Sequence, residues 1–176
     1  VRGGTGTGKT WHALEQAFRY AGRSDGQRVL FLTYNKALTA QLRRIVELKK
    51  LDHGEVIVRG WEELFSELCT VAGKHVTVPA SGSPVETIRS FYEVELPATV
   101  LAISRDEELR KNWPRFDALV VDEGQDHDTC WHTEIQTQPS ESGGWWHIYR
   151  LLLADGADSP ASVFYDAAQR PPFRAA

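Results

Sequence analysis

The chain has 176 residues, 41% of them hydrophobic and 25% charged, which is enough to bury one sizeable core in a single domain. Its formal net charge of -4 excludes a global basic field, so any nucleic-acid contact must come from a local face. No apolar run reaches membrane-spanning length and no secretory signal opens the chain, which predicts a cytoplasmic location without membrane contact. Cys69 and Cys130 lie too far apart for a CxxC pair, so we expect neither a disulfide framework nor a thiolate metal site.

Strand and helix patterns alternate along the chain. In order, we expect a helix over 9–21, a strand over 29–33, a helix over 36–50, a strand over 55–58, a helix carrying residues 61–68, a loop over 73–83, a helix that ends near Pro97, a helix over 98–111, a strand over 118–121, a helix over 145–153 and a strand over 162–165. Ser83, Pro84 and Glu86 predict the start of the helix before Pro97, with Ser83 as its N-cap. The continuous apolar strands are typical of a parallel sheet covered on both faces. The fold class is therefore α/β.

A glycine-rich string precedes the first helix. Gly3-Gly4-Thr5-Gly6-Thr7-Gly8-Lys9-Thr10 satisfies G-x-x-x-x-G-K-[ST] in full. The glycines let backbone N–H groups approach phosphates, Lys9 supplies a charge between the β- and γ-phosphates, and the Thr10 hydroxyl ligates Mg²⁺. A merely flexible loop would leave Lys9 and Thr10 without a role. The string predicts binding of ATP with Mg²⁺.

Two acids follow the buried strand 118–121. Asp122 and Glu123 then lie at the carboxyl edge of the sheet, where sheets of this class place their ligands. Asp122 is expected in the magnesium shell, and Glu123 is expected to orient and deprotonate the attacking water. An Asp-Glu pair alone is a weak signal, but it complements the glycine-rich loop.

Four strings resemble, in order, the motifs of the UvrD/Rep-like superfamily 1 helicases: residues 3–10 motif I, 32–38 motif Ia, 122–126 motif II (DEGQD) and 164–169 motif III. The resemblance spans nearly the whole chain. It implies a P-loop NTPase lobe with a RecA-like three-layer α/β/α fold and a mostly parallel sheet. It also implies ATP-driven movement along single-stranded DNA.

The resemblance also implies roles for single residues. Gln125 would couple the hydrolysis site to the DNA surface, and Gln169 would sense the γ-phosphate. Thr33, Tyr34 and Asn35 would touch the DNA strand, with Asn35 open to a second reading as a helix N-cap. Trp61 stands at an aromatic position of motif Ib, where base stacking and core packing are equally open.

We expect residues 1–176 to be a single RecA-like ATP-binding lobe excerpted from a longer chain, with a small helical insertion at about 66–112. The second RecA-like lobe of the parent chain would be its partner, as would single-stranded DNA. The rival interpretations are a nucleotide-gated regulatory or defence P-loop ATPase and, less favoured, a P-loop kinase. His127, Cys130 and His132 lie close together but fit no standard zinc spacing.

Overall fold

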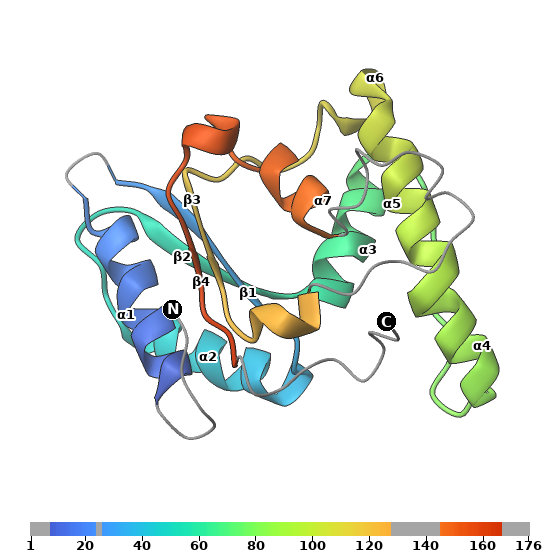
Figure 1. Ribbon diagram of the computed structural model, residues 1–176, viewed down its shortest axis with the longest axis horizontal. Helices are drawn as coiled ribbons and strands as arrows, with labels where there is room; N and C mark the ends of the chain where they lie inside the picture. The colour runs from blue at the N-terminus through green and yellow to red at the C-terminus, as the bar shows by residue number, and fades with distance from the viewer. Residues whose placement is uncertain (1–7, 24–25, 128–144, 167–176) are drawn as a thin grey trace.

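The computed structural model describes residues 8–23, 26–127 and 145–166, and their core is a parallel four-stranded sheet (Figure 1). The strands are β1 (Arg28–Thr33), β2 (Glu55–Gly60), β3 (Ala118–Val121) and β4 (Ala161–Val163), in the spatial order β2-β1-β3-β4. All three neighbouring pairs are parallel. The predicted α/β class with a parallel sheet is confirmed.

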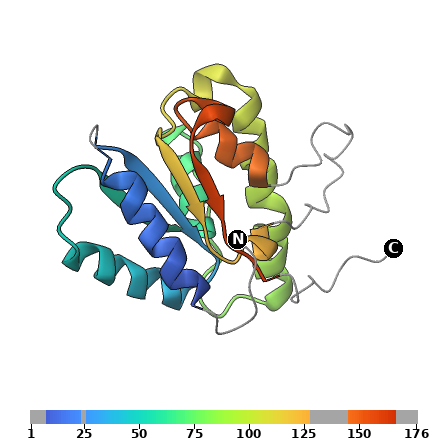
Figure 2. The same cartoon turned by 60° about the vertical axis from the view of Figure 1, so that its left-hand side comes forward.

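Helices cover both faces of the sheet (Figure 2). On one face, α1 (Lys9–Ala21) and α2 (Lys36–Leu48) pack against Val29 and Phe31 of β1. On the other face, α3 (Trp61–Val71), α5 (Leu96–Arg105) and α7 (Trp145–Leu151) pack against Leu30 and Leu32. Because successive side chains of a strand point to opposite faces, a strand buried on both sides needs the unbroken apolar run seen in the sequence. The result is a three-layer α/β/α arrangement.

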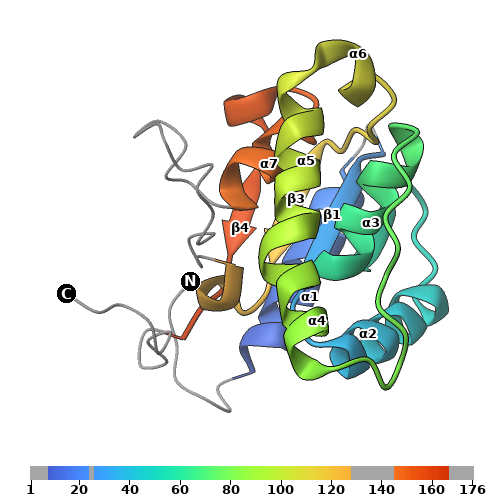
Figure 3. The same ribbon diagram turned by 90° about the vertical axis from the view of Figure 1, so that its right-hand side faces the viewer.

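One long helix crosses the face that carries α3 and α7 (Figure 3). It consists of α4 (Val85–Ser90), the π-helical turn η1 (Phe91–Glu95) and α5, and it is followed by the short α6 (Glu107–Arg110). The segment 66–112, predicted as a small helical insertion, thus contains the end of α3 and all of α4 to α6. Its Leu68, Leu96 and Val100 belong to the same core cluster as Leu30 and Leu32 of the sheet.

The prediction that a helix ends near Pro97 is wrong. The backbone stays helical through Glu95 (φ -69°, ψ -49°) and Leu96 (φ -64°, ψ -48°), and Pro97 lies in the first turn of α5. The Leu96 N–H donates to the carbonyl of Phe91, five residues back, so Pro97 falls where the hydrogen-bond pattern changes register. A proline in a first helical turn leaves few bonds unmade, which is why the helix continues.

Other predicted boundaries shift for local reasons. Pro84, not Ser83, is the N-cap residue of α4, and it has no side-chain capping bond. The predicted helix 98–111 is broken at Asp106, whose carboxylate accepts from the backbone N–H groups of Glu108 and Leu109 and starts α6. β4 ends at Val163, two residues early, because Val163 pairs with Val121, the last residue of β3.

Three further boundaries differ by two residues each. β2 runs to Gly60 instead of residue 58, since its partner β1 extends to Thr33 and pairs with it there. α2 ends at Leu48 instead of residue 50. α7 ends at Leu151 instead of residue 153, because Leu153 leaves the helix to form a β-bridge with Phe116. The short elements η2 (Gly124–His127) and η4 (Gly156–Asp158) are single 3-10 turns.

Candidate nucleotide site and the neighbouring strand ends

The candidate nucleotide site begins where α1 starts. Gly8 precedes the helix in the left-handed region (φ 74°), and an added Cβ there would meet no atom within 4 Å. Glycine is therefore favoured at this position by backbone conformation and not by space. Lys9 and Thr10 belong to the first turn of α1, and in the first turn of any helix the backbone N–H groups lie ahead of the regular intrahelical hydrogen bonds and point toward the N-terminus. Gly3, Gly4, Thr5, Gly6 and Thr7 lie outside the described residues.

The start of α1 meets the end of β3 across 112 positions of sequence. The Thr10 hydroxyl donates to Oδ2 of Asp122 at 2.6 Å. Asp122 is fully buried, and its other oxygen, Oδ1, has no hydrogen-bond partner among the described residues. Burial raises the pKa of the Asp122 carboxyl, the charge of Glu123 raises it further, and the bond from Thr10 opposes both. A buried carboxylate oxygen without a partner is costly unless a ligand satisfies it.

These two side chains fit a magnesium ion. Mg²⁺ prefers hard oxygen ligands and is commonly held by one or two protein oxygens together with substrate phosphates and water. The hydroxyl of Thr10 and the unpaired Oδ1 of Asp122 supply that donor set. The positive charge of the magnesium ion would also compensate the charge of the buried Asp122 carboxylate.

Lys9 contacts an acid that the sequence did not identify. Its Nζ lies 3.6 Å from Oδ2 of Asp166, and both side chains are buried. Asp166 follows β4 at the same edge of the sheet at which Asp122 follows β3. That shared position was the available signal, since carboxyl ends of parallel strands meet at one edge. Asp166 is therefore an additional candidate site residue.

Glu123 has a backbone conformation that non-glycine residues seldom adopt, with φ at 53°. Its side chain accepts a hydrogen bond from Nε2 of Gln125 at 2.6 Å, and Oε1 of Gln125 accepts from the backbone N–H of Asp166 at 3.0 Å. Gln125 thus bridges the acid pair after β3 and the chain after β4. Left-handed strain at such a residue is typical of functional sites. Gln169 lies outside the described residues.

Gly124 closes the contact between these two strand ends. Its N–H donates to the carbonyl of Phe164 at 2.8 Å, and an added Cβ would lie 2.5 Å from Cγ1 of Val163. Any side chain at this position would therefore collide with β4. The glycine of the DEGQD string is required by close packing between β3 and β4.

The residues at the end of β1 divide into buried and exposed members. Thr33 is fully buried, and its hydroxyl oxygen accepts from the N–H of Asn35 at 3.2 Å. The Asn35 carboxamide accepts from the N–H groups of Ala37 and Leu38, so its predicted role as N-cap of α2 is confirmed. Tyr34 is 46% exposed and presents its ring to solvent.

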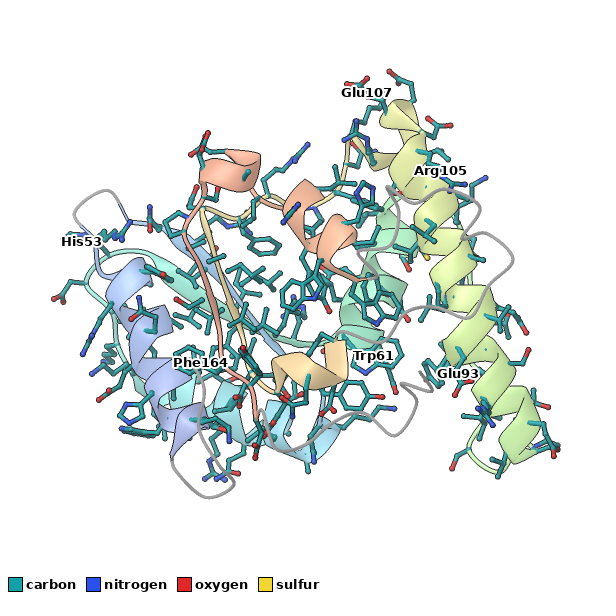
Figure 4. The ribbon with its side chains drawn as sticks, viewed as in Figure 1. His53, Trp61, Glu93, Arg105, Glu107 and Phe164 are labelled. Carbon is teal, nitrogen blue, oxygen red and sulfur yellow. The ribbon has the colours of Figure 1, made fainter. Side chains whose placement is uncertain are left out.

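Trp61 is a core residue with one face against Tyr34. Only 7% of it is exposed, and it belongs to the core cluster on the α3 side of the sheet (Figure 4). The Tyr34 ring stacks on it with centroids 5.7 Å apart and planes 16° from parallel. Of the two open readings, core packing describes Trp61, and Tyr34 is the exposed member of the stacked pair.

His127 is the last residue of the 3-10 turn that follows the acid pair. Its Nδ1 lies 2.6 Å from the hydroxyl of Tyr149, and its ring meets that of Tyr34 edge-on at 6.0 Å. Burial lowers its pKa to about 4, so the ring is neutral. Cys130 and His132 lie outside the described residues. Within the described part, no group of three or more metal-ligating side chains forms.

A helix that follows a glycine-rich string and meets a buried acid at the carboxyl edge of a parallel sheet is the arrangement of P-loop nucleotide-binding domains. Residues 1–125 match the family model described as "Type III restriction enzyme, res subunit", and the chain belongs to this family. Neither the curated proteins nor the solved structures contain a match. In the part of the chain that the structure describes, no helix is both long and apolar enough to cross a membrane.

Proposed function

We propose that this chain is the ATP-binding and ATP-hydrolysing lobe of a UvrD-like superfamily 1 helicase or translocase that acts on single-stranded DNA. The observation that carries this proposal is the 2.6 Å bond between Thr10 and Asp122, with Oδ1 of Asp122 left for a metal. The family match supports a helicase-like ATPase in general. The narrower assignment depends on the DEGQD string and on the bridge that Gln125 makes. Cytoplasmic location stays a prediction from sequence.

In the proposed mechanism, Thr10 and Asp122 would hold Mg²⁺, and the ion would supply positive charge that offsets the charge of the phosphates. Lys9 exchanges its contact with Asp166 for the γ-phosphate and stabilises the charge that develops on it. Glu123 orients a water molecule and takes its proton as the water oxygen attacks the γ-phosphorus. The bond from phosphorus to the β–γ bridging oxygen breaks, which gives ADP and inorganic phosphate.

Gln125 is the residue through which we propose that the nucleotide site communicates. Its amide touches Glu123 with one atom and the backbone of Asp166 with the other. A change in the position of Glu123 is therefore transmitted through Gln125 to the backbone at Asp166, which follows β4. Gln169, three residues beyond Asp166, is proposed to sense the γ-phosphate.

Tyr34 and Asn35 are proposed to contact the DNA strand, with Thr33 holding the turn between them and β1. An exposed aromatic ring stacks on a base of any sequence, which suits a motor that moves along DNA. Trp61 supports the ring of Tyr34 from its buried side. The second RecA-like lobe of a parent chain would complete the nucleotide site.

Calorimetry with this chain tests the proposal at the nucleotide site. We expect heat on titration with Mg·ATP and a clear loss of affinity when Mg²⁺ is omitted. Hydrolysis should be very slow without a second lobe, with or without single-stranded DNA. Absence of binding, or fast DNA-stimulated turnover by the isolated chain, would contradict the proposal.

A second assay separates single strands from duplex. Fluorescence anisotropy should show that the chain binds a labelled single strand more tightly than the same sequence as duplex. Tyr34→Ala should weaken single-strand binding by roughly one stacked base, about 1–3 kcal/mol, and Tyr34→Phe should retain it. Equal binding to duplex and single strand would favour a different member of the helicase-like class.

A further inference from the structure

A groove lies beside the nucleotide site, between the start of α2, the start of α3 and η1. It has a volume of about 310 Å³. Its lining includes three aromatic side chains and two cation–carboxylate pairs, from Tyr34, Trp61, Tyr92, Lys36 with Glu62, and Arg43 with Glu63. The hydrolysis mechanism uses none of these groups.

Aromatic rings form the apolar part of the groove. Trp61 is stacked under Tyr34 and meets Tyr92 edge-on, with centroids 5.8 Å apart and planes at 71°. Tyr92 belongs to the π-helical turn η1, whose first residue, Phe91, is buried in the core. π-Helical turns are rare and are found mostly at functional sites. The exposed ring of Tyr34 and the ring of Tyr92 offer flat apolar surface to a base.

The charges at the groove are already paired. Nζ of Lys36 lies 2.5 Å from Oε2 of Glu62 and 5.6 Å from the centre of the Tyr92 ring. Arg43 pairs with Glu63 in the same way. The groove therefore carries two cations and two anions, so a phosphate that approaches either cation also meets the negative charge of the paired carboxylate. Lys36 is 76% exposed at its side chain and Glu62 only 24%, so the lysine is the partner free to move.

We propose that this groove receives one unstacked base of a single DNA strand, and that Glu62 competes with the neighbouring phosphate for Lys36. The inference rests on the proposed function and deepens it. The uncharged base enters among the rings, and the phosphate takes the ammonium group from the carboxylate. Glu62 thereby lowers the affinity for DNA and favours release of the strand, which a translocating protein needs at every step.

The test measures binding of a short fluorescein-labelled deoxythymidine oligonucleotide to the whole chain at several salt concentrations. Glu62→Gln should tighten binding about two- to fivefold, the range set by exposed ion pairs. It should also steepen the dependence of log K on log salt by up to about 0.7, because Lys36 then gives one more full phosphate contact. Lys36→Gln should weaken binding, and adding Glu62→Gln to Lys36→Gln should bring little further gain.

Glu108→Gln is the matched control. Glu108 makes a similar pair with Lys111, with Nζ and Oε2 2.6 Å apart, in α6 at the other end of the long helix (Figures 1 and 3). Glu108→Gln changes the net charge of the chain by the same amount as Glu62→Gln, but it frees no cation at the groove. An equal gain from Glu62→Gln and Glu108→Gln, or an undiminished gain from Glu62→Gln in the Lys36→Gln background, would overturn the competition.

An abasic oligonucleotide of the same length tests the base itself. The unchanged chain should prefer the oligonucleotide with bases, and Tyr92→Ala should reduce that preference without changing the salt dependence. If Tyr92→Ala leaves the preference for the oligonucleotide with bases unchanged, the base does not bind in the groove. If neither the unchanged chain nor any variant binds single-stranded DNA, the proposed DNA-binding function fails, and this inference fails with it. Binding with no response to Glu62→Gln refutes the inference alone.

Discussion

Substitution of Gly124 by alanine probes the contact between the acid pair after β3 and the end of β4. The new Cβ would lie 2.5 Å from Cγ1 of Val163, whereas carbon atoms in contact are about 3.5–4.0 Å apart. The overlap is about 1 Å, so β4 or the Glu123–Gly124 turn must shift. Overpacking of this kind costs about 1–3 kcal/mol, which corresponds to a melting temperature lower by roughly 2–12 °C in a chain of this size.

Thermal unfolding followed by circular dichroism gives the stability change, and Mg·ATP calorimetry reports on the site. Val163→Ala removes the colliding methyl group and should restore part of the stability of Gly124→Ala, with a favourable coupling of about 0.5–3 kcal/mol in the double-mutant cycle. Gly60→Ala is the control, because its Cβ would make only an ordinary contact of 3.5 Å with Thr39. A Gly124→Ala protein with unchanged melting temperature, or purely additive effects in the cycle, would refute the reasoning.

Four further results are expected. Glu123→Gln should still bind Mg·ATP while hydrolysis falls about 10²-fold or more, as quantified by phosphate release; a rate near that of the unchanged chain would remove Glu123 as the base. Thr10→Val, which breaks the bond to Asp122, should weaken ATP binding about tenfold or more with Mg²⁺ present and much less without it, as calorimetry would measure. Because the pKa of His127 is about 4 when folded and about 6.5 when unfolded, its contribution to stability is lost as the pH falls from about 6.5 to 4, by up to about 3 kcal/mol; urea unfolding of His127→Gln should lack that loss. The thiol of Cys69, buried and with its pKa raised to about 11, should react with iodoacetamide only after unfolding, as peptide mass spectrometry would detect.

Much of the fold follows from local pattern. The unbroken apolar runs of β1 and β3 predict strands covered on both faces, and the parallel sheet follows from their alternation with helices. The helix around Pro97 shows the limit of that reasoning. Proline ends helices by local rules, but here burial of Leu96 and Val100 and the π-helical turn before them keep the helix intact.

The candidate site was predictable only where two known sequence motifs are expected to lie next to each other in the fold. The glycine-rich string and the acid pair predict that Thr10 and Asp122 converge, and the structure brings them to 2.6 Å. The contact of Lys9 with Asp166 and the collision that forbids a side chain at Gly124 were not predicted. The position of Asp166 after a strand indicates the sheet edge, but its pairing with Lys9 and the close approach of Val163 to Gly124 depend on how α1, β3 and β4 pack together, which no local pattern of residues encodes.

The position of β1 limits how the two sides of this molecule can influence each other. β1 pairs with β2 on one side and β3 on the other, so the strand that precedes Tyr34 is bonded from Val29 to Leu32 to the strand that precedes Asp122. Such a strand cannot slide or hinge without breaking both ladders at once. If ATP and DNA bind as proposed, the described contacts that join the two sites run along the sheet edge, from the ring of Tyr34 to His127 and through the 3-10 turn that carries Gln125 and follows Glu123.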